Sequence, residues 1–155
     1  MTKSIEIIKK PRLALFELIK DLSIEQLNQV PTGFNNNIIW NLGHLVAAQQ
    51  GICYRRAGVE MIVSEDYYNT YGPGSKPERF ISQAELDEIK GYFTSTLDQF
   101  VVDYNNNVFA NYVAWTTRYG VDLNNVEDAF KFLPFHEGLH FGYVMAQKRA
   151  LLSAI

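Results

Sequence analysis

The alternation of apolar and polar residues along the chain predicts four helices. Apolar side chains recur at intervals of three and four residues over residues 4–22, 37–57, 82–104 and from about 125 to the C-terminus. This spacing gives a helix one apolar face, and such a face must be covered by another element. We therefore expect an all-α fold, a four-helix bundle with long crossover connections, formed by a single domain over residues 1–155.

Residues that favour helix ends mark the boundaries of these segments. Ser82 and Glu85 have the spacing of a capping box, which predicts the start of the third helix. Gly58 stands where a glycine commonly ends a helix. Ser23 is followed three residues later by Gln26, which predicts a short helical turn between the first two long helices.

Two prolines and two connections are harder to assign. Pro11 either opens the first helix or kinks it, and Pro134 predicts a kink or a restart of the last helix just before His136. We interpret residues 59–81 as a loop, and connections of this length are often functional. Residues 108–124 are rich in β-branched and aromatic side chains, so a strand, a hairpin and a packed loop all remain open there.

Composition narrows the classes of function. The formal net charge of −3 argues against a general affinity for nucleic acid or for an anionic membrane. The single cysteine, Cys53, excludes an internal disulfide. The N-terminal segment lacks the apolar stretch of a signal peptide, and no apolar run is long enough to span a bilayer. We expect a cytoplasmic protein with a small-molecule partner and no nucleic-acid or membrane partner.

The distribution of histidines is the strongest chemical feature. The chain has three histidines, and all of them occupy positions where the apolar pattern predicts core side chains. His136 and His140 are about one helical turn apart, so they project from the same face of the last helix. His44 lies in the second helix. Three neutral imidazoles from facing helices can bind one divalent metal ion and leave a position open for water or substrate, so we predict a metal site formed by these residues.

The same residues match a second pattern. From His136 to His140 the chain reads HEGLH, which is the H-E-x-x-H pattern of zinc peptidases, where the glutamate acts as general base. The additional histidine of metzincins, eleven residues after the first, is replaced here by Gln147. A metallopeptidase is therefore the less favoured alternative. Glu137 is a candidate catalytic base, and its other interpretation is a carboxylate that supports a ligand or lies on the helix surface.

Other polar side chains are placed near the predicted site. Asn41, one turn before the histidine of the second helix, could hydrogen-bond a metal ligand or a substrate, although a buried structural role fits equally well. Tyr143, seven residues after the first histidine of the pair, could donate to a bound substrate or simply pack. Arg55 and Arg118 could bind a substrate carboxylate or be solvated.

Two segments give the chain a resemblance to a known family. Residues 36–45 read NNIIWNLGHL, and residues 129–142 read AFKFLPFHEGLHFG. With this order and spacing, the chain resembles the DinB-like (YfiT-like) superfamily. The resemblance implies a four-helix bundle in which His44, His136 and His140 bind one divalent metal, often zinc or nickel. Pro134 departs from the small or polar residue that is common before the histidine pair.

The resemblance also implies classes of activity. The superfamily includes thiol-dependent transferases and isomerases, and homodimers are frequent in it. We therefore expect a metal-dependent enzyme that activates a low-molecular-weight thiol, or water, for transfer to or hydrolysis of a small molecule. The alternative from a different class is a non-catalytic, metal-stabilised bundle that binds ligands or acts in a stress response.

Overall fold

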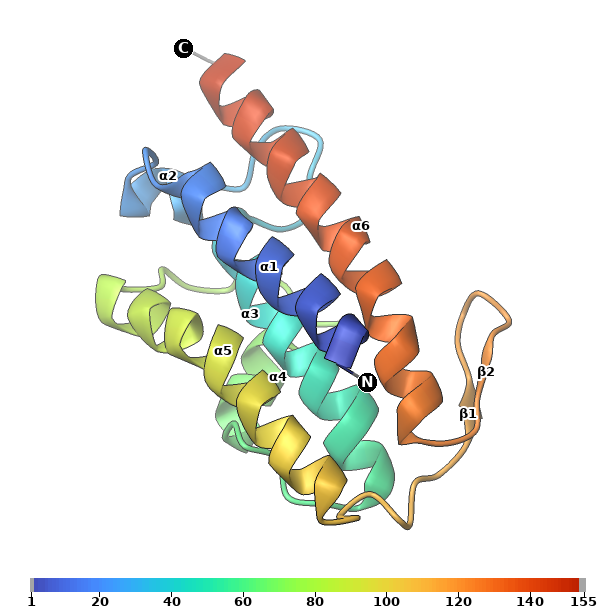
Figure 1. Cartoon of the computed structure of the whole chain (residues 1–155). Helices are drawn as coiled ribbons and strands as arrows, with labels where there is room; N and C mark the ends of the chain where they lie inside the picture. Colours follow the sequence, from blue (N-terminus) through green and yellow to red (C-terminus); the bar gives the residue numbers. More distant parts are fainter. Residues whose placement is uncertain (1, 154–155) are drawn as a thin grey trace.

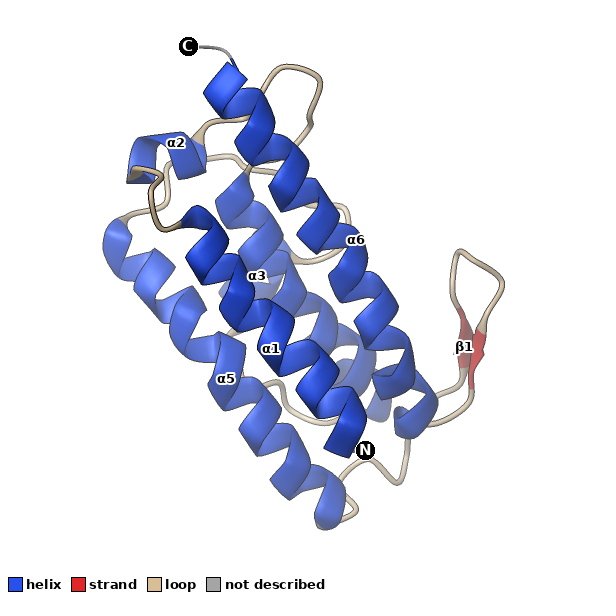
Figure 2. Ribbon diagram, turned by 45° about the horizontal axis from the view of Figure 1, so that its top comes forward, coloured by secondary structure: helices blue, strands red, loops and turns tan. Residues whose placement is uncertain are grey.

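Four long helices account for most of the fold, and each packs against two of the others. In the computed structural model, which describes residues 2–153, they are α1 (Thr2–Ile19), α3 (Ile38–Gln49), α5 (Gln83–Asn105) and α6 (Val126–Ser153). Helices α1 and α3 both pack against α5 and α6, so the four form a bundle (Figure 2), and the buried apolar side chains fall into two clusters along it. Helices α1 and α6 run in one direction and α3 and α5 in the other (Figure 1). The predicted all-α bundle is confirmed.

Helix α3 is the most buried helix of the bundle. Its sequence, IIWNLGHLVAAQ, contains no acidic or basic residue apart from His44, and all 12 of its residues are buried. A helix that is apolar on nearly every side is expected to be surrounded on every side. Asn37 caps its start, since the side-chain oxygen accepts a hydrogen bond from the backbone N–H of Trp40 (2.8 Å). Helix α3 therefore holds His44 in a rigid setting.

The end of the second helical segment departs from regular α geometry. Helix α3 continues into a π-helical turn, η1 (Gln50–Tyr54), and a 3₁₀ turn, η2 (Arg55–Ala57). Gly58 ends the segment with φ at 67°, in the left-handed region that a glycine adopts without strain. The predicted glycine stop is confirmed. The π turn, in which the hydrogen bonds span five residues instead of four, was not predicted.

The prediction of a loop over residues 59–81 is wrong in part, because this connection contains helix α4 (Glu65–Tyr71). The hydroxyl of Ser64 accepts a hydrogen bond from the backbone N–H of Tyr67 (3.1 Å) and caps the helix. The two buried side chains of α4 are Tyr67 and Tyr71, which pack on α3 and belong to its core cluster. A helix this short shows too few apolar positions for its period to be recognised.

Both internal prolines are accommodated within continuous helices. Helix α1 neither begins at Pro11 nor stops there, and α6 passes through Pro134 without the restart that the sequence suggested. A proline removes one hydrogen bond and costs about 3 kcal/mol inside a helix. Phe130 and Leu133, just before Pro134, are completely buried, and burial of two such side chains offsets a cost of that size.

The remaining elements are short. Helix α2 (Ile24–Asn28) begins with the predicted capping box of Ser23 and Gln26. Strands β1 (Trp115–Thr116) and β2 (Asp122–Leu123) form an antiparallel hairpin, which is one of the three alternatives left open for this region. The hairpin lies beside the first half of α6 (Figure 1). None of the described helices is both long and apolar enough to cross a membrane.

Candidate metal centre

The three histidines converge on one point between α3 and α6. One ring nitrogen from each of His44, His136 and His140 lies within 4.8 Å of the others. The centroid of the His140 ring is 4.6 Å from that of His44 and 4.6 Å from that of His136. A group of three such donors could hold one metal ion.

Hydrogen bonds fix the orientation of two of the imidazoles. The Nδ1 atom of His44 lies 2.7 Å from the backbone carbonyl oxygen of Tyr71. Because a carbonyl can only accept, Nδ1 carries the proton and Nε2 keeps its lone pair. The Nδ1 atom of His140 lies 2.7 Å from Oδ1 of Asn41, which again leaves Nε2 free. Metal-binding histidines commonly donate their second ring N–H in this way.

The orientation of the Asn41 amide is itself fixed by neighbouring groups. Its Nδ2 donates to the backbone carbonyl of Asn37 (2.8 Å) and to Oε1 of Gln147 (3.1 Å), so Oδ1 faces His140. Gln147 in turn donates to the side-chain oxygen of Asn36 (2.7 Å). The sequence left two interpretations of Asn41, a hydrogen bond to a metal ligand or substrate and a purely structural role. The structure has the first kind of contact, a hydrogen bond to His140. The supporting contact of Gln147 was missed, because the sequence showed it only as the residue in place of a histidine.

The third imidazole has a buried nitrogen without a partner. Nδ1 of His136 makes no hydrogen bond within the described part of the chain, although it is buried. A buried polar atom without a partner is destabilising. A divalent metal ion bound by one nitrogen of each of the three imidazoles would give His136 a partner. The residues present therefore fit a divalent metal.

All three imidazoles are held in the neutral form that binds metals. Burial lowers the pKa of His136 to about 2, and the neighbouring imidazoles of His140 and His44 act in the same direction. Burial likewise lowers the pKa of His140 to about 3 and lowers that of His44. The positive charge of Arg118 lowers the pKa of each of the three, which indicates that this side chain lies near all of them.

Glu137, the candidate general base, is directed into the bundle towards α1 and does not join the three histidines. Its carboxylate is buried and accepts hydrogen bonds from Nη2 of Arg12 at 2.6 Å and from Nε at 3.1 Å. Burial raises the pKa of Glu137, and the Arg12 guanidinium opposes that shift. The carboxylate is not among the groups that line the cavity above the histidines. The geometry therefore favours the second interpretation of Glu137, a carboxylate in a supporting role.

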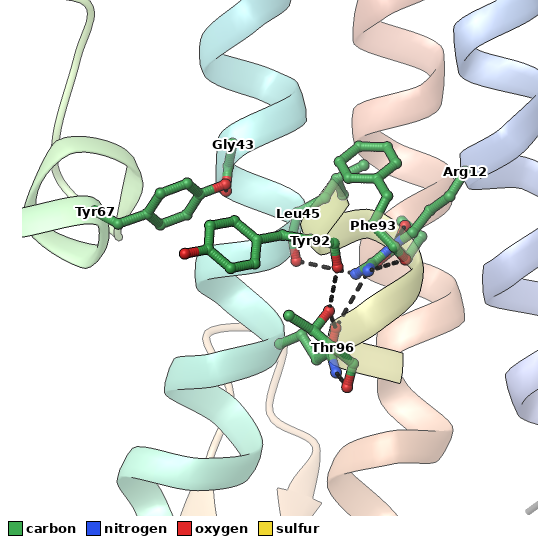
Figure 3. A network of polar contacts seen from close by, with 9 residues as sticks. Arg12, Gly43, Leu45, Tyr67, Tyr92, Phe93 and Thr96 are labelled. Carbon is green, nitrogen blue, oxygen red and sulfur yellow. Dashed lines mark hydrogen bonds and ion pairs between the residues drawn. The ribbon is translucent and has the colours of Figure 1, made fainter. Parts of the chain in front are cut away.

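Arg12 was missed by the sequence analysis, and it is central to the bundle. Its guanidinium also donates to the backbone carbonyls of Leu45 in α3 (3.2 Å) and Phe93 in α5 (3.1 Å), and to Oε1 of Gln49 (3.2 Å). Figure 3 shows the guanidinium surrounded by these helices. All five N–H groups of the guanidinium are thus used. A signal was available, because Arg12 lies between the fully buried residues Ile8 and Leu15 on the apolar face of α1.

A cavity of about 740 Å³ opens above the histidines. Trp40, whose ring stacks on that of His44 at 4.6 Å, forms part of its wall. Tyr143 also lines the cavity and is 51% exposed, so its hydroxyl is accessible to a bound molecule. The hairpin closes another side. The aromatic side chains of the wall are Trp40, Tyr68, Trp115, Tyr119, Phe132 and Tyr143.

Of the two arginines that the sequence suggested, Arg118 lines the cavity and Arg55 does not. Arg55 lies over the ring of Tyr68 and pairs with Glu65 (3.5 Å). Its neighbour Arg56 lines the cavity instead. The reason is the π turn, which takes more residues than an α turn. In a regular α-helix, Arg55 would point towards the site, because it lies eleven residues after His44. With the extra residue of the π turn, Arg56 points there instead.

Comparison with known proteins places the chain in a family. No curated protein matches the chain. The model of the family described as the DinB superfamily matches residues 8–144, which is most of the chain. The match includes His44, His136 and His140, together with Arg12 and the hairpin that covers the cavity. On this evidence the chain belongs to the DinB superfamily.

Proposed function

We propose that this protein is a divalent-metal-dependent enzyme that activates a small thiol or water for transfer to, or hydrolysis of, a small-molecule substrate. The observation that carries the proposal is the position of the three imidazoles on the wall of an open cavity. Structural zinc sites are usually closed by four protein ligands, whereas catalytic sites have three and an open position.

His44, His136 and His140 would hold the ion, with zinc or nickel as the first candidates. When bound, such an ion supplies Lewis acidity. It would lower the pKa of a coordinated thiol or water, so that the deprotonated, nucleophilic form is available at neutral pH. The carbonyl of Tyr71 and the amide of Asn41 orient two of the ligands.

The cavity has the properties of a small-molecule site. Its volume of about 740 Å³ lies in the range of such pockets, and Trp40 and Tyr143 give it apolar walls with a hydroxyl at the edge. This location of Tyr143 supports a hydrogen bond from its hydroxyl to substrate. Tyr143 therefore remains a proposed substrate-binding residue, whereas Asn41 does not line the cavity and is proposed to act only by orienting His140.

The peptidase alternative has little support from the geometry. In an H-E-x-x-H peptidase the glutamate must reach the water on the metal. The carboxylate of Glu137 is instead paired with Arg12 inside the bundle. Within residues 3–153 no carboxylate lines the cavity, so we assign the proton-accepting role to no acidic side chain of this chain.

The proposal is tested by assaying the purified protein with zinc or nickel. Bacillithiol, glutathione and cysteine would each be offered with a model electrophile such as 1-chloro-2,4-dinitrobenzene, and an activated ester would be offered to test hydrolysis. We expect turnover that is lost on chelation and in His44→Ala. Strong stabilisation by metal without turnover in any arm would favour the non-catalytic, metal-stabilised bundle.

Two further parts of the proposal concern the setting of the reaction. A cytoplasmic location suits it, because low-molecular-weight thiols are kept reduced there. A homodimer, which the family resemblance implied, is tested by light scattering of the purified protein; a mass of 17.8 kDa, that of one chain, would contradict it.

A further inference from the structure

We infer that the cavity above the histidines binds an organic carboxylate, with the carboxylate group held by Arg118 and Arg56 and the organic body against the aromatic wall. This inference rests on the proposed function only in taking the cavity as the substrate site. It adds the chemical class of the ligand.

The first observation is the charge of the cavity wall. Arg56 and Arg118 both line the cavity, and no described carboxylate does. Neither arginine forms an ion pair within residues 3–153, whereas Arg55, the neighbour of Arg56, pairs with Glu65. The cavity therefore has two positive charges that the protein leaves uncompensated, and an anionic ligand would neutralise them.

The second observation is the way in which the two guanidinium groups are held. The guanidinium of Arg56 lies over the ring of Trp115 at 4.6 Å, and that of Arg118 lies over the ring of Tyr119 at 5.5 Å. Stacking fixes the plane of a guanidinium and leaves its N–H edge free. That edge matches the two oxygens of a carboxylate and can bind both at once. Each side chain is therefore partly organised for an anion before the anion binds.

The third observation is that the cationic and the apolar surfaces belong to the same cavity as the histidines. Arg56, Arg118 and the three histidines all line this one cavity. The same wall includes the apolar side chains of Phe132 and Leu139 of α6 and of Trp40 of α3. A ligand with a carboxylate at one end and an apolar or planar body would match this arrangement. Its reactive atom would then face the histidine triad.

The carboxylate could belong to the electrophilic substrate or to a thiol cosubstrate, since the cavity recognises the same group in both. The two sources are separated by competition. S-methylglutathione has carboxylates and no free thiol, and 4-phenylbutyrate has a carboxylate on an apolar body. If the thiol cosubstrate occupies the arginines, S-methylglutathione displaces 4-phenylbutyrate; if the substrate does, both bind without displacement.

The test compares 4-phenylbutyrate with its neutral amide on chelator-treated protein. Without metal, a carboxylate cannot gain affinity by coordination. Both tryptophans of the chain, Trp40 and Trp115, line the cavity, so their fluorescence reports binding directly, with calorimetry as a second readout. We expect the acid to bind at least about a hundredfold more tightly than the amide, as charge-assisted hydrogen bonds from two arginines predict at about tenfold each.

Substitutions assign the effect to the arginines. In Arg118→Gln and in Arg56→Gln the preference for the acid should fall by about tenfold, and in the double variant it should disappear. Arg55→Gln is the matched control and should keep the full preference, because Arg55 does not line the cavity. Equal affinity of wild type for acid and amide, or a preference that survives in the double variant, would overturn the inference.

This experiment also separates the inference from the proposed function. It needs neither metal nor turnover. If the protein prefers the acid and catalyses no reaction, the carboxylate site is supported and the proposed enzymatic function is contradicted. If the protein turns over substrate and binds acid and amide equally, the proposed function is supported and the carboxylate site is contradicted. Both arginines are exposed, so the Gln variants are expected to fold, and their melting temperatures check this.

Discussion

One turn of α6 has two sides with opposite chemistry. On one side, His136 and His140 face an open cavity as neutral groups with their metal-binding capacity free. On the other side, Glu137 is 4% exposed and its charge is paired with Arg12. Residues that are adjacent in the sequence thus belong to the candidate metal site and to the buried core. A short sequence motif does not distinguish these two settings.

The buried pair of Glu137 and Arg12 also affects the position of the histidines. Through Arg12, the carboxylate of Glu137 is connected to α3 at Leu45 and to α5 at Phe93. A buried ion pair contributes little net stability but defines one arrangement, because leaving either charge unpaired is costly. We infer that this pair fixes the rotation of α6 about its axis. His136 and His140 are directed towards His44 as a result.

The largest expected effect is on the structural side. Arg12→Met leaves the Glu137 charge buried without a partner, so the free energy of unfolding should fall by about 3–5 kcal/mol, as measured by urea denaturation. Lys9→Met is the matched control. Lys9 pairs with Asp98 on the surface, and such pairs contribute less than about 1 kcal/mol. Equal effects of the two substitutions would contradict the structural role of Arg12.

The next effect separates the two sides of the turn directly. His140→Ala should reduce the affinity for zinc by more than about a hundredfold, because losing only an outer hydrogen-bond partner already costs about 10–100-fold. Glu137→Gln keeps the shape of the side chain and should retain the metal. Metal content after dialysis, measured by mass spectrometry, checks both variants. Full metal retention in His140→Ala would eliminate the proposed site.

A smaller loss of zinc affinity is expected when a residue that supports a histidine is changed. Asn41→Ala removes the acceptor that orients His140, so zinc affinity should fall about 10–100-fold, as measured by competition with a chromophoric chelator. Asn28→Ala provides the control, since this amide bonds the backbone of Ile81 away from the histidines. Asn28→Ala should lower stability without changing zinc affinity. An equal loss of zinc affinity in both variants would show that Asn41 acts only through general stability.

The smallest effect sharpens the contrast between open and packed positions. Gly138 lies between the two histidines of α6, and an added Cβ would meet nothing within 4 Å. Gly138→Ala should therefore raise the free energy of unfolding by about 0.5–1 kcal/mol through helix propensity. In Gly43→Ala the new Cβ would lie 2.4 Å from the ring of Tyr71, and a loss of about 1–3 kcal/mol is expected. Thermal denaturation distinguishes these opposite signs.

Much of the fold could be predicted from the sequence because its signals are local. The four apolar stripes predicted the long helices, and the capping box at Ser82 and the glycine at position 58 set two boundaries. The convergence of the three histidines followed from their positions on two apolar helical faces. Helix α4 escaped because its buried side chains are tyrosines, which resemble loop residues as readily as core residues.

The parts that could not be predicted depend on contacts between distant segments or on irregular backbone. Arg12 and Glu137 are 125 positions apart, and periodicity treats each of them as an isolated charge. The π turn after α3 shifts all later side chains, so Arg56 took the place expected for Arg55. The hydrogen bond that the Asn41 amide donates to the side-chain oxygen of Gln147 likewise has no signature in either helix alone.

The hairpin of β1 and β2 contributes to the cavity wall and holds none of the three histidines, and this separation affects how the sequence can evolve. Trp115, Arg118 and Tyr119 contribute to the cavity from this short segment, while the histidines are carried by α3 and α6. Mutations in the hairpin would therefore change the cavity wall and leave the three histidines of the candidate metal site in place. Residues 115–123 could therefore be exchanged as one unit, in evolution or by design, while α3 and α6 keep the three histidines together.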